Sequence, residues 1–410
     1  SFPGPEIHAN VIHSILQNDF VRPVSDSRNL WAMIILSCAL GLVCGIPGKP
    51  FWGFGLLVVS AVVWVIYATS QFMSDGIMWD VVRPMVSLAM TQLSVFSFTF
   101  LVMDRDKRFL RDTFGTYISP ELIEQMVEDK EEPKLGGDEA VHTAFFTDVQ
   151  SFSTFSEELS ASDLVELLNT YLTDMTTTLL KNRGTLDKYI GDAIIGFFGA
   201  PVPVEDHEVR ACETALDMQK GLAELRVRWK NEDGKWPEIV HNMQHRIGIH
   251  TGPMVTGNMG SEQRMNYTMM GDTVNLAARL ESSCKQYGVF TQISDSTYSS
   301  VKDRFVIREL DRIIVVGRKE PVTTYELISR IGEESDNMKK LLPDFAEAIS
   351  LYRSQEWGKA IELFQSIDHL EDMHEGRKTN PCRTYVKRCE QYKQDPPPKN
   401  WDGVTALTSK

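Results

Sequence analysis

The stretch that decides the fold of this chain is "LDKYIGDAIIGFFGAP", Leu186 to Pro201. Two runs rich in β-forming residues flank Gly191-Asp192, a dipeptide that suits a tight hairpin turn. Asp192 would then lie at the tip of the hairpin instead of in an apolar core. A hairpin in the middle of a sheet can hold this carboxylate beside the end of a neighbouring strand, and we expect that strand in "AVHTAFFTDV".

Asp148, near the end of that second stretch, is the expected neighbour of Asp192. Two carboxylates held side by side repel each other, and their pKa values rise unless a cation lies between them. Paired aspartates that leave positions for substrate phosphates suit Mg²⁺ or Mn²⁺. Each residue alone has a structural explanation, since Asp148 could cap the next helix and Asp192 could simply favour its turn. The metal interpretation therefore depends on the pair.

Length and composition limit the other possibilities. The chain has 410 residues, enough for two or three domains, and its 42% hydrophobic content is that of a packed protein. The formal charge of -14 argues against nucleic acid as a partner. Six cysteines without a CxxC pair favour free thiols over a zinc site or a disulfide framework. Because the chain opens on Ser1 without an initiator Met, we expect an upstream portion that is missing here.

Three segments without charged residues, 30–46, 51–70 and 85–103, are long enough to cross about 30 Å of hydrocarbon. The alternative is buried core helices. The third segment has a polar side, which favours packing between helices or subunits. Basic residues in "DRDKRFLR" after the third segment and Lys49 between the first two predict that residues from 104 onward are cytoplasmic and 1–28 external. We expect a multi-pass protein of the inner (plasma) membrane, with the lipid bilayer as a partner.

The segments around these spans contain two further resemblances. "PGPEIHANVIHSILQNDFVRP" is an amphipathic helix, and by its position it resembles the end of a CHASE-type sensor domain of the second class, which precedes three spans in that family. Ser119-Pro120 marks the start of a coupling helix, followed by the polar linker "EDKEEPKLGG". "GGDE" at 136–139 is similar to the diguanylate cyclase signature, but it precedes the first strand, so we expect a flexible turn and a strand from about Ala140.

Four segments in order resemble the catalytic domain of class III nucleotidyl cyclases: "FFTDVQSFS", "KYIGDAIIGFFGAP", "RIGIHTGPMVTGNMGS" and "YTMMGDTVNLAARLE". The likeness runs from about Phe109 to Leu327, and the 44-residue spacing of Asp148 and Asp192 fits the family. The resemblance implies an α+β fold, a ferredoxin-like βαββαβ core with additions. It also implies a head-to-tail homodimer with its active sites at the interface.

Residue roles follow from the same resemblance. Asp148, Asp192 and Val149 form the metal site for two Mg²⁺ or Mn²⁺ ions, one activating the ribose 3′-hydroxyl and the other holding the triphosphate. The turn with Phe152 and Ser153 holds the β- and γ-phosphates through backbone amides. The catalytic pair, four residues apart on one helical face, orients the ribose and stabilises the transition state; it consists of Asn275 and Arg279. Its structural alternative is an ordinary exposed helical face.

Base choice depends on Lys188 and Thr268. In the family a Lys at this position donates to adenine N1 and an Asp or Thr partner reads the 6-amino group, whereas guanylyl cyclases carry Glu and Cys. Lys188 with Thr268 predicts ATP and the Lys/Thr subclass. One departure concerns "VVGRKEP", which places Val316 where the family often has a triphosphate-binding Lys. The alternatives are that Arg318 or Lys319 reaches the phosphates instead, or that the affinity for ATP is lower, and we favour Arg318.

After Leu327, "LLPDFAEAISLYRSQEWGKAIELFQSI" resembles a single TPR-like helical hairpin, which cannot bury its face alone and should pack on the cyclase or on a protein partner. The Pro run in "QDPPPKNWDGVTALTSK" is typical of a semi-rigid spacer. The predicted regions are a sensor end at 1–28, spans at 29–104, a coupling segment at 105–137, a catalytic domain at 138–330 and a tail at 331–410. The predicted function is a membrane-anchored adenylate cyclase; the alternatives are a guanylyl cyclase and a catalytically silent cyclase-fold receptor that recruits partners.

Overall fold

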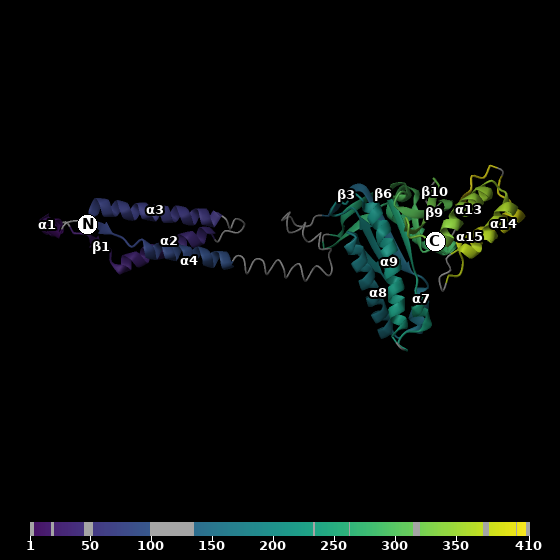
Figure 1. The fold of residues 1–410 in the computed structure, drawn as a ribbon, viewed down its shortest axis with the longest axis horizontal. Helices are drawn as coiled ribbons and strands as arrows, with labels where there is room; N and C mark the ends of the chain where they lie inside the picture. Colours follow the sequence, from purple (N-terminus) through teal and green to yellow (C-terminus); the bar gives the residue numbers. More distant parts are fainter. Residues whose placement is uncertain are drawn as a thin grey trace. The chain divides into compact units, whose positions relative to one another are not determined.

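The computed structural model describes residues 4–17, 20–44, 52–98, 135–232, 234–261, 263–314, 320–371, 377–398 and 400–406. The chain divides into two compact units, Ser1–Pro120 and Glu121–Lys410, and each is described by itself (Figure 1). Arg318 and Val316 lie outside the described residues, as does the predicted coupling helix around Ser119.

The first unit is helical. Two short strands, β1 and β2, pair in parallel, and helices α2, α3 and α4 pack on one another. The hydroxyl groups of Ser37 in α2 and Ser87 in α4 lie 2.8 Å apart, so one polar residue of the third predicted span does bridge two helices. The bounds are α1 Gly4–Gln17, β1 Arg22–Pro23, α2 Asp26–Cys44, α3 Trp52–Asp75, β2 Ile77–Met78 and α4 Val82–Phe98.

Two stretches within these helices, Asp26–Val43 and Phe54–Asp75, are long and apolar enough to cross a membrane by length and composition. Large apolar side chains on the helices point outward, as at Leu42, which is 78% exposed, and Ile66, which is 63% exposed. The third predicted span overlaps α4, and its last residues, 99–103, lie outside the described part of the chain.

The second unit is built on one sheet, whose described strands run in the order β11-β9-β10-β8-β6-β3-β5-β4, with β7 paired to β6. Its first part has the predicted βαββαβ order: β3, α8, β4, β5, α9 and β6. The bounds of the catalytic part are β3 Gly136–Val149, α7 Phe152–Glu158, α8 Ala161–Lys181, β4 Thr185–Ile190, β5 Ala193–Phe198, α9 His207–Lys230, α10 Glu238–His241, β6 His245–Ser261, β7 Arg264–Met270, α11 Asp272–Tyr287, β8 Thr291–Ser294, α12 Asp295–Val301, β9 Phe305–Ile314 and β10 Val322–Arg330.

Alternating side chains of β3 supply both cores of this sheet. Phe145 packs in a cluster with the buried stripe of α8 (Tyr171, Met175), while Ala144 packs in a second cluster with Ala277 of α11. Because successive residues of a strand point to opposite faces, the two clusters lie on the two sides of the sheet. Figure 1 shows α8 and α9 side by side along one face. The predicted α+β class is confirmed.

The predicted start of β3 was wrong. The strand begins at Gly136, so the "GGDE" segment is not a turn but pairs with residues 255–258 of β6. A Cβ atom on Gly137 would lie 2.7 Å from the Thr256 carbonyl oxygen. The glycines that suggested a turn therefore allow close approach of two strands.

The tail is part of the second unit. Two helices at the predicted positions, α13 and α14, share a core with a third, α15, which was not predicted. The Glu371 carboxylate accepts a hydrogen bond from the buried Arg308 of β9 at 2.7 Å. The segment after the Pro run adds a short parallel strand to β9, so it does more than act as a spacer. The bounds are α13 Asp336–Arg353, α14 Trp357–Ile367, a 3₁₀ turn Asp368–Leu370, α15 Pro381–Gln394 and β11 Val404–Ala406.

Candidate active site

The β4–β5 hairpin turns at the predicted dipeptide. Gly191 has φ 64°, in the left-handed region that a residue without Cβ enters freely, and Asp192 follows it. Since β5 pairs with β3, the turn lies at the end of β3, where the Val149 amide donates a hydrogen bond to Asp192 Oδ2 at 2.9 Å. The structure thus brings Asp192 to the strand end that carries Asp148.

Arg246 completes this corner and was missed by sequence reasoning. The register of β3 and β6 pairs Asp148 with Arg246, whose guanidinium donates to Asp148 Oδ2 at 2.5 Å and to Glu281 Oε1 at 2.9 Å. We call Asp148, Asp192, Arg246 and Glu281 the metal corner. No local sequence signal marks Arg246, because only the strand register places it opposite Asp148.

The metal corner carries more negative charge than its own arginine balances. Burial raises the pKa of Asp192, which is 8% exposed, and the nearby charge of Asp148 raises it further. Burial raises the pKa of Glu281 to about 7 although Arg246 opposes that shift. The carboxylate pair therefore favours a cation.

The donor set fits a small divalent ion. Within the described ranges, no cluster of three or more His, Cys, Asp or Glu side chains forms a protein-only metal site. Mg²⁺ commonly takes one or two carboxylates and completes its coordination with water and substrate phosphates. Asp148 and Asp192, with the adjacent backbone of Val149, suit such an incomplete oxygen site.

Lys188, Thr268 and Asp187 form a second cluster, which we call the base corner. Lys188 Nζ in β4 donates to Thr268 Oγ1 in β7 at 3.3 Å, so the two predicted base-reading residues meet within one chain. Thr268 Oγ1 donates to Asp187 Oδ2 at 2.7 Å, and Lys188 Nζ lies 3.4 Å from Asp187 Oδ1. Burial raises the pKa of Asp187, while the Thr268 hydroxyl and the Lys188 ammonium oppose that shift.

Asp187 was not singled out from the sequence, yet it sets the polarity of Thr268. Because the hydroxyl proton of Thr268 is directed at the Asp187 carboxylate, the Thr268 oxygen is left as an acceptor. An acceptor matches an amino group and not a carbonyl oxygen.

Two of the other predicted site residues, Asn275 and Arg279, are not bonded to the metal ligands. In the described residues, Asn275 and Arg279 of α11 have no side-chain hydrogen bond or ion pair with Asp148 or Asp192; Asn275 is exposed and Arg279 half-buried. Phe152 and Ser153 begin α7 directly after the turn at Ser151, which has φ 60°. Arg318 has no described position.

Residues 138–329 match the family described as the adenylate and guanylate cyclase catalytic domain. The cyclase domain predicted from the four motifs is thereby confirmed.

Particular relatives are adenylate cyclases. The chain is 30% identical over 61% of its length to "Adenylate cyclase, terminal-differentiation specific" of Dictyostelium discoideum, and 32% identical over 53% to "Adenylate cyclase 1" of Rhizobium meliloti. It spans 11% and 32% of those two proteins. Among solved structures, the adenylyl cyclase CyaB from P. aeruginosa is 35% identical, with a TM-score of 0.44, covering 49% of this chain and 100% of that one.

Proposed function

We propose that this chain is a membrane-anchored adenylyl cyclase that converts ATP to 3′,5′-cyclic AMP and pyrophosphate as a homodimer. The observation that carries the proposal is the hairpin that holds Asp192 at the end of β3 beside Asp148, in a domain of the cyclase family. Within the same chain the 3.3 Å contact between Lys188 and Thr268 supports ATP as the substrate.

The metal corner would hold two Mg²⁺ or Mn²⁺ ions through Asp148, Asp192 and the Val149 backbone. When bound, such ions lower the pKa of a hydroxyl nucleophile and neutralise charge on the phosphates. The chain's own part is to fix the carboxylates: the Val149 amide orients Asp192, and Arg246 orients Asp148. The amides of Phe152 and Ser153, in the first turn of α7 and without intrahelical partners there, would receive the phosphates.

The base corner would read adenine. The Lys188 ammonium donates to N1, and the Thr268 oxygen accepts from the 6-amino group because its proton is given to Asp187. Guanine presents a protonated N1 and a 6-carbonyl oxygen, so both contacts would be mismatched. A site whose polar groups are left unpaired rejects the wrong substrate strongly.

The dimer would complete each site. Asn275 and Arg279 lie on α11 with exposed surface, and in the described part of the chain neither forms a hydrogen bond or ion pair with Asp148 or Asp192. This arrangement suits a pair of residues that acts in the site of a partner protomer. There, Asn275 would orient the ribose and Arg279 would stabilise charge on the α-phosphate. A two-fold dimer then contains two equivalent sites.

Anchoring in the inner membrane is supported by the two apolar helical stretches of the first unit and by their outward apolar side chains. With a third span at 85–103, the basic residues after it would keep the cyclase cytoplasmic. A CHASE-type sensor at the external end would then regulate the enzyme.

The test is to incubate the full chain with Mn²⁺ and either ATP or GTP and to identify the product by mass. Cyclic AMP from ATP, without comparable product from GTP, is the expected result. Cyclic GMP as the main product would make the protein a guanylyl cyclase. No product from either nucleotide would favour the catalytically silent receptor.

A further inference from the structure

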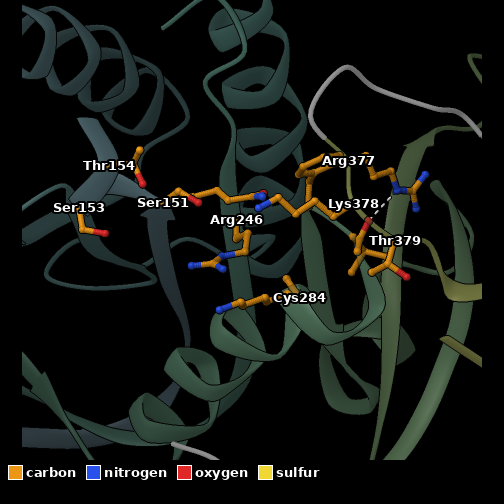
Figure 2. A pocket seen from close by; sticks show the side chains of 13 residues that line it. Ser151, Ser153, Thr154, Arg246, Cys284, Arg377, Lys378 and Thr379 are labelled. Atoms are coloured by element: carbon orange, nitrogen blue, oxygen red, sulfur yellow. Dashed lines mark hydrogen bonds between the residues drawn. The ribbon is translucent and has the colours of Figure 1, made fainter. Parts of the chain in front are cut away.

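A cavity of about 410 Å³ lies beside the metal corner. One wall is the turn after β3, with Gln150, Ser151 and Ser153; Arg246, which holds Asp148, also lines it. The opposite wall comes from the tail, with Lys378 (Figure 2). The volume is within the range of roughly 300–1,000 Å³ typical of small-molecule sites.

The lining has one sign of charge. Arg246, Lys285, Arg377 and Lys378 face the cavity, and no Asp or Glu is among the described residues that line it. The positive charge of this lining is opposite in sign to the formal charge of the whole chain, which is -14. A concave surface lined by cations concentrates anions. The ligand class that fits is therefore a compact polyanion.

Two of the four cations have structural partners. Arg246 is bonded to Asp148 and Glu281. Arg377 donates from Nε to the Gly288 carbonyl oxygen at 2.8 Å. Lys378, by contrast, is exposed and forms no ion pair with any carboxylate in the described ranges. Figure 2 shows its side chain extending into the cavity toward the wall that carries Ser151 and Arg246.

The position of Lys378 is fixed by the packing of the tail on α11. The Thr384 hydroxyl donates to the Gln286 carbonyl oxygen at 3.0 Å. Gly288 has φ 66°, and a Cβ atom there would lie 2.0 Å from the Thr379 carbonyl oxygen. The backbone next to Lys378 thus packs directly on the end of α11, and the tail forms one wall of the cavity.

We propose that Lys378 of the tail binds the terminal phosphates of ATP and the pyrophosphate that leaves. The proposal rests on the cyclase function proposed above. Phosphates held at Asp148 and Asp192 would reach the cavity past Arg246, which borders both places. Lys378 would then supply the ammonium group that the family resemblance expects at the position of Val316.

The test compares Lys378→Gln with Lys378→Arg in the full chain. Lys387→Gln is the matched control, because Lys387 is an exposed lysine of α15 that does not line the cavity. Two experiments are made: calorimetry gives the dissociation constant of pyrophosphate with Mg²⁺, and steady-state kinetics give KM and kcat for ATP. We expect Lys378→Gln to weaken pyrophosphate binding and raise KM about tenfold, the effect of one hydrogen bond to a charged group. Lys378→Arg should restore most of both, and Lys387→Gln should match the wild type.

If the wild type makes cyclic AMP and Lys378→Gln changes neither quantity relative to Lys387→Gln, the inference is wrong and the cyclase function stands. If the wild type makes no cyclic nucleotide but binds pyrophosphate in a Lys378-dependent way, the cyclase function fails and the anion site stands. A third outcome is that Lys378→Gln loses pyrophosphate binding and cyclase activity, has a lowered unfolding temperature, and is not rescued by Lys378→Arg. This outcome would show that Lys378 has a structural role and would overturn the inference.

Discussion

The metal corner and the base corner both join acidic and basic groups, but their charges balance differently. In the metal corner three carboxylates share one guanidinium, and burial raises the pKa of two of those carboxylates. In the base corner one carboxylate, one ammonium group and one hydroxyl group contact one another, so the charges of the two ionised groups are paired. Under the proposed function, the metal corner takes up cations from outside, whereas the base corner is already ordered to meet a neutral base.

The largest expected effect comes from removing charge at the metal corner. Asp192→Asn should keep the hairpin, since Asn suits the turn and can still accept from the Val149 amide, but it should lower kcat at least about 10³-fold because a metal ligand is lost. Activity with Mg²⁺ and the denaturation midpoint should be measured together. Near wild-type activity in a folded variant would end the metal assignment.

The second prediction tests whether Arg279 of a partner protomer completes the site that contains Asp148. Asp148→Ala and Arg279→Ala should each lower activity by about 10²-fold or more. In a mixed dimer of the two, one site contains both lesions and the other contains neither. A doubly tagged, purified mixed dimer should recover about half of wild-type activity, given two independent sites. No recovery would place each site within a single chain.

Reversing the hydrogen-bonding pattern of the base corner should have a smaller effect. Lys188→Glu with Thr268→Cys should lower kcat/KM for ATP by about 10²-fold, because Glu cannot donate to adenine N1. GTP turnover need not appear, since pocket shape also contributes. Unchanged ATP turnover would show that the pair does not read the base.

A milder change tests the polarity that Asp187 sets. Asp187→Asn can donate to the Thr268 oxygen, which frees the hydroxyl proton for a carbonyl acceptor. We expect the ratio of kcat/KM for ATP to kcat/KM for GTP to fall about tenfold, because the change leaves Asp192 and the rest of the metal corner in place. A change in total activity with a constant ratio would indicate that Asp187 only supports folding.

The smallest expected effect is on stability and concerns His245, the first residue of β6, which precedes Arg246 of the metal corner. Burial lowers the pKa of His245 to about 3, and its Nδ1 lies 3.0 Å from the Tyr171 hydroxyl. The unfolded chain binds this proton near pH 6.5 and the folded chain near pH 3. The free energy of unfolding should therefore fall as pH drops below 6.5, by at most about 1.4 kcal/mol per pH unit. His245→Gln should flatten this slope in denaturant titrations followed by tryptophan fluorescence; an identical slope would exclude His245 as its source.

Local chemistry explains what the sequence could predict. The Gly191-Asp192 turn could be predicted because a two-residue hairpin has its own residue preferences, and the class followed from motifs that surround it. Arg246 could not, because its partner Asp148 is 98 residues away and is reached only through strand register. The same limit applies to Asp187, whose role depends on β7. In the tail, the run of prolines indicated a spacer, so the short strand that follows it was not predicted.

That short strand, β11, has a practical consequence. It pairs with the last three residues of β9, Arg312 to Ile314, on the outer edge of the catalytic sheet. A protein shortened to the family-matched residues 138–329 would expose the backbone donors and acceptors of that edge and remove Glu371 from the buried Arg308. Open strand edges recruit other chains. Dimers of such a fragment would therefore report on adhesion between sheet edges as well as on the catalytic interface.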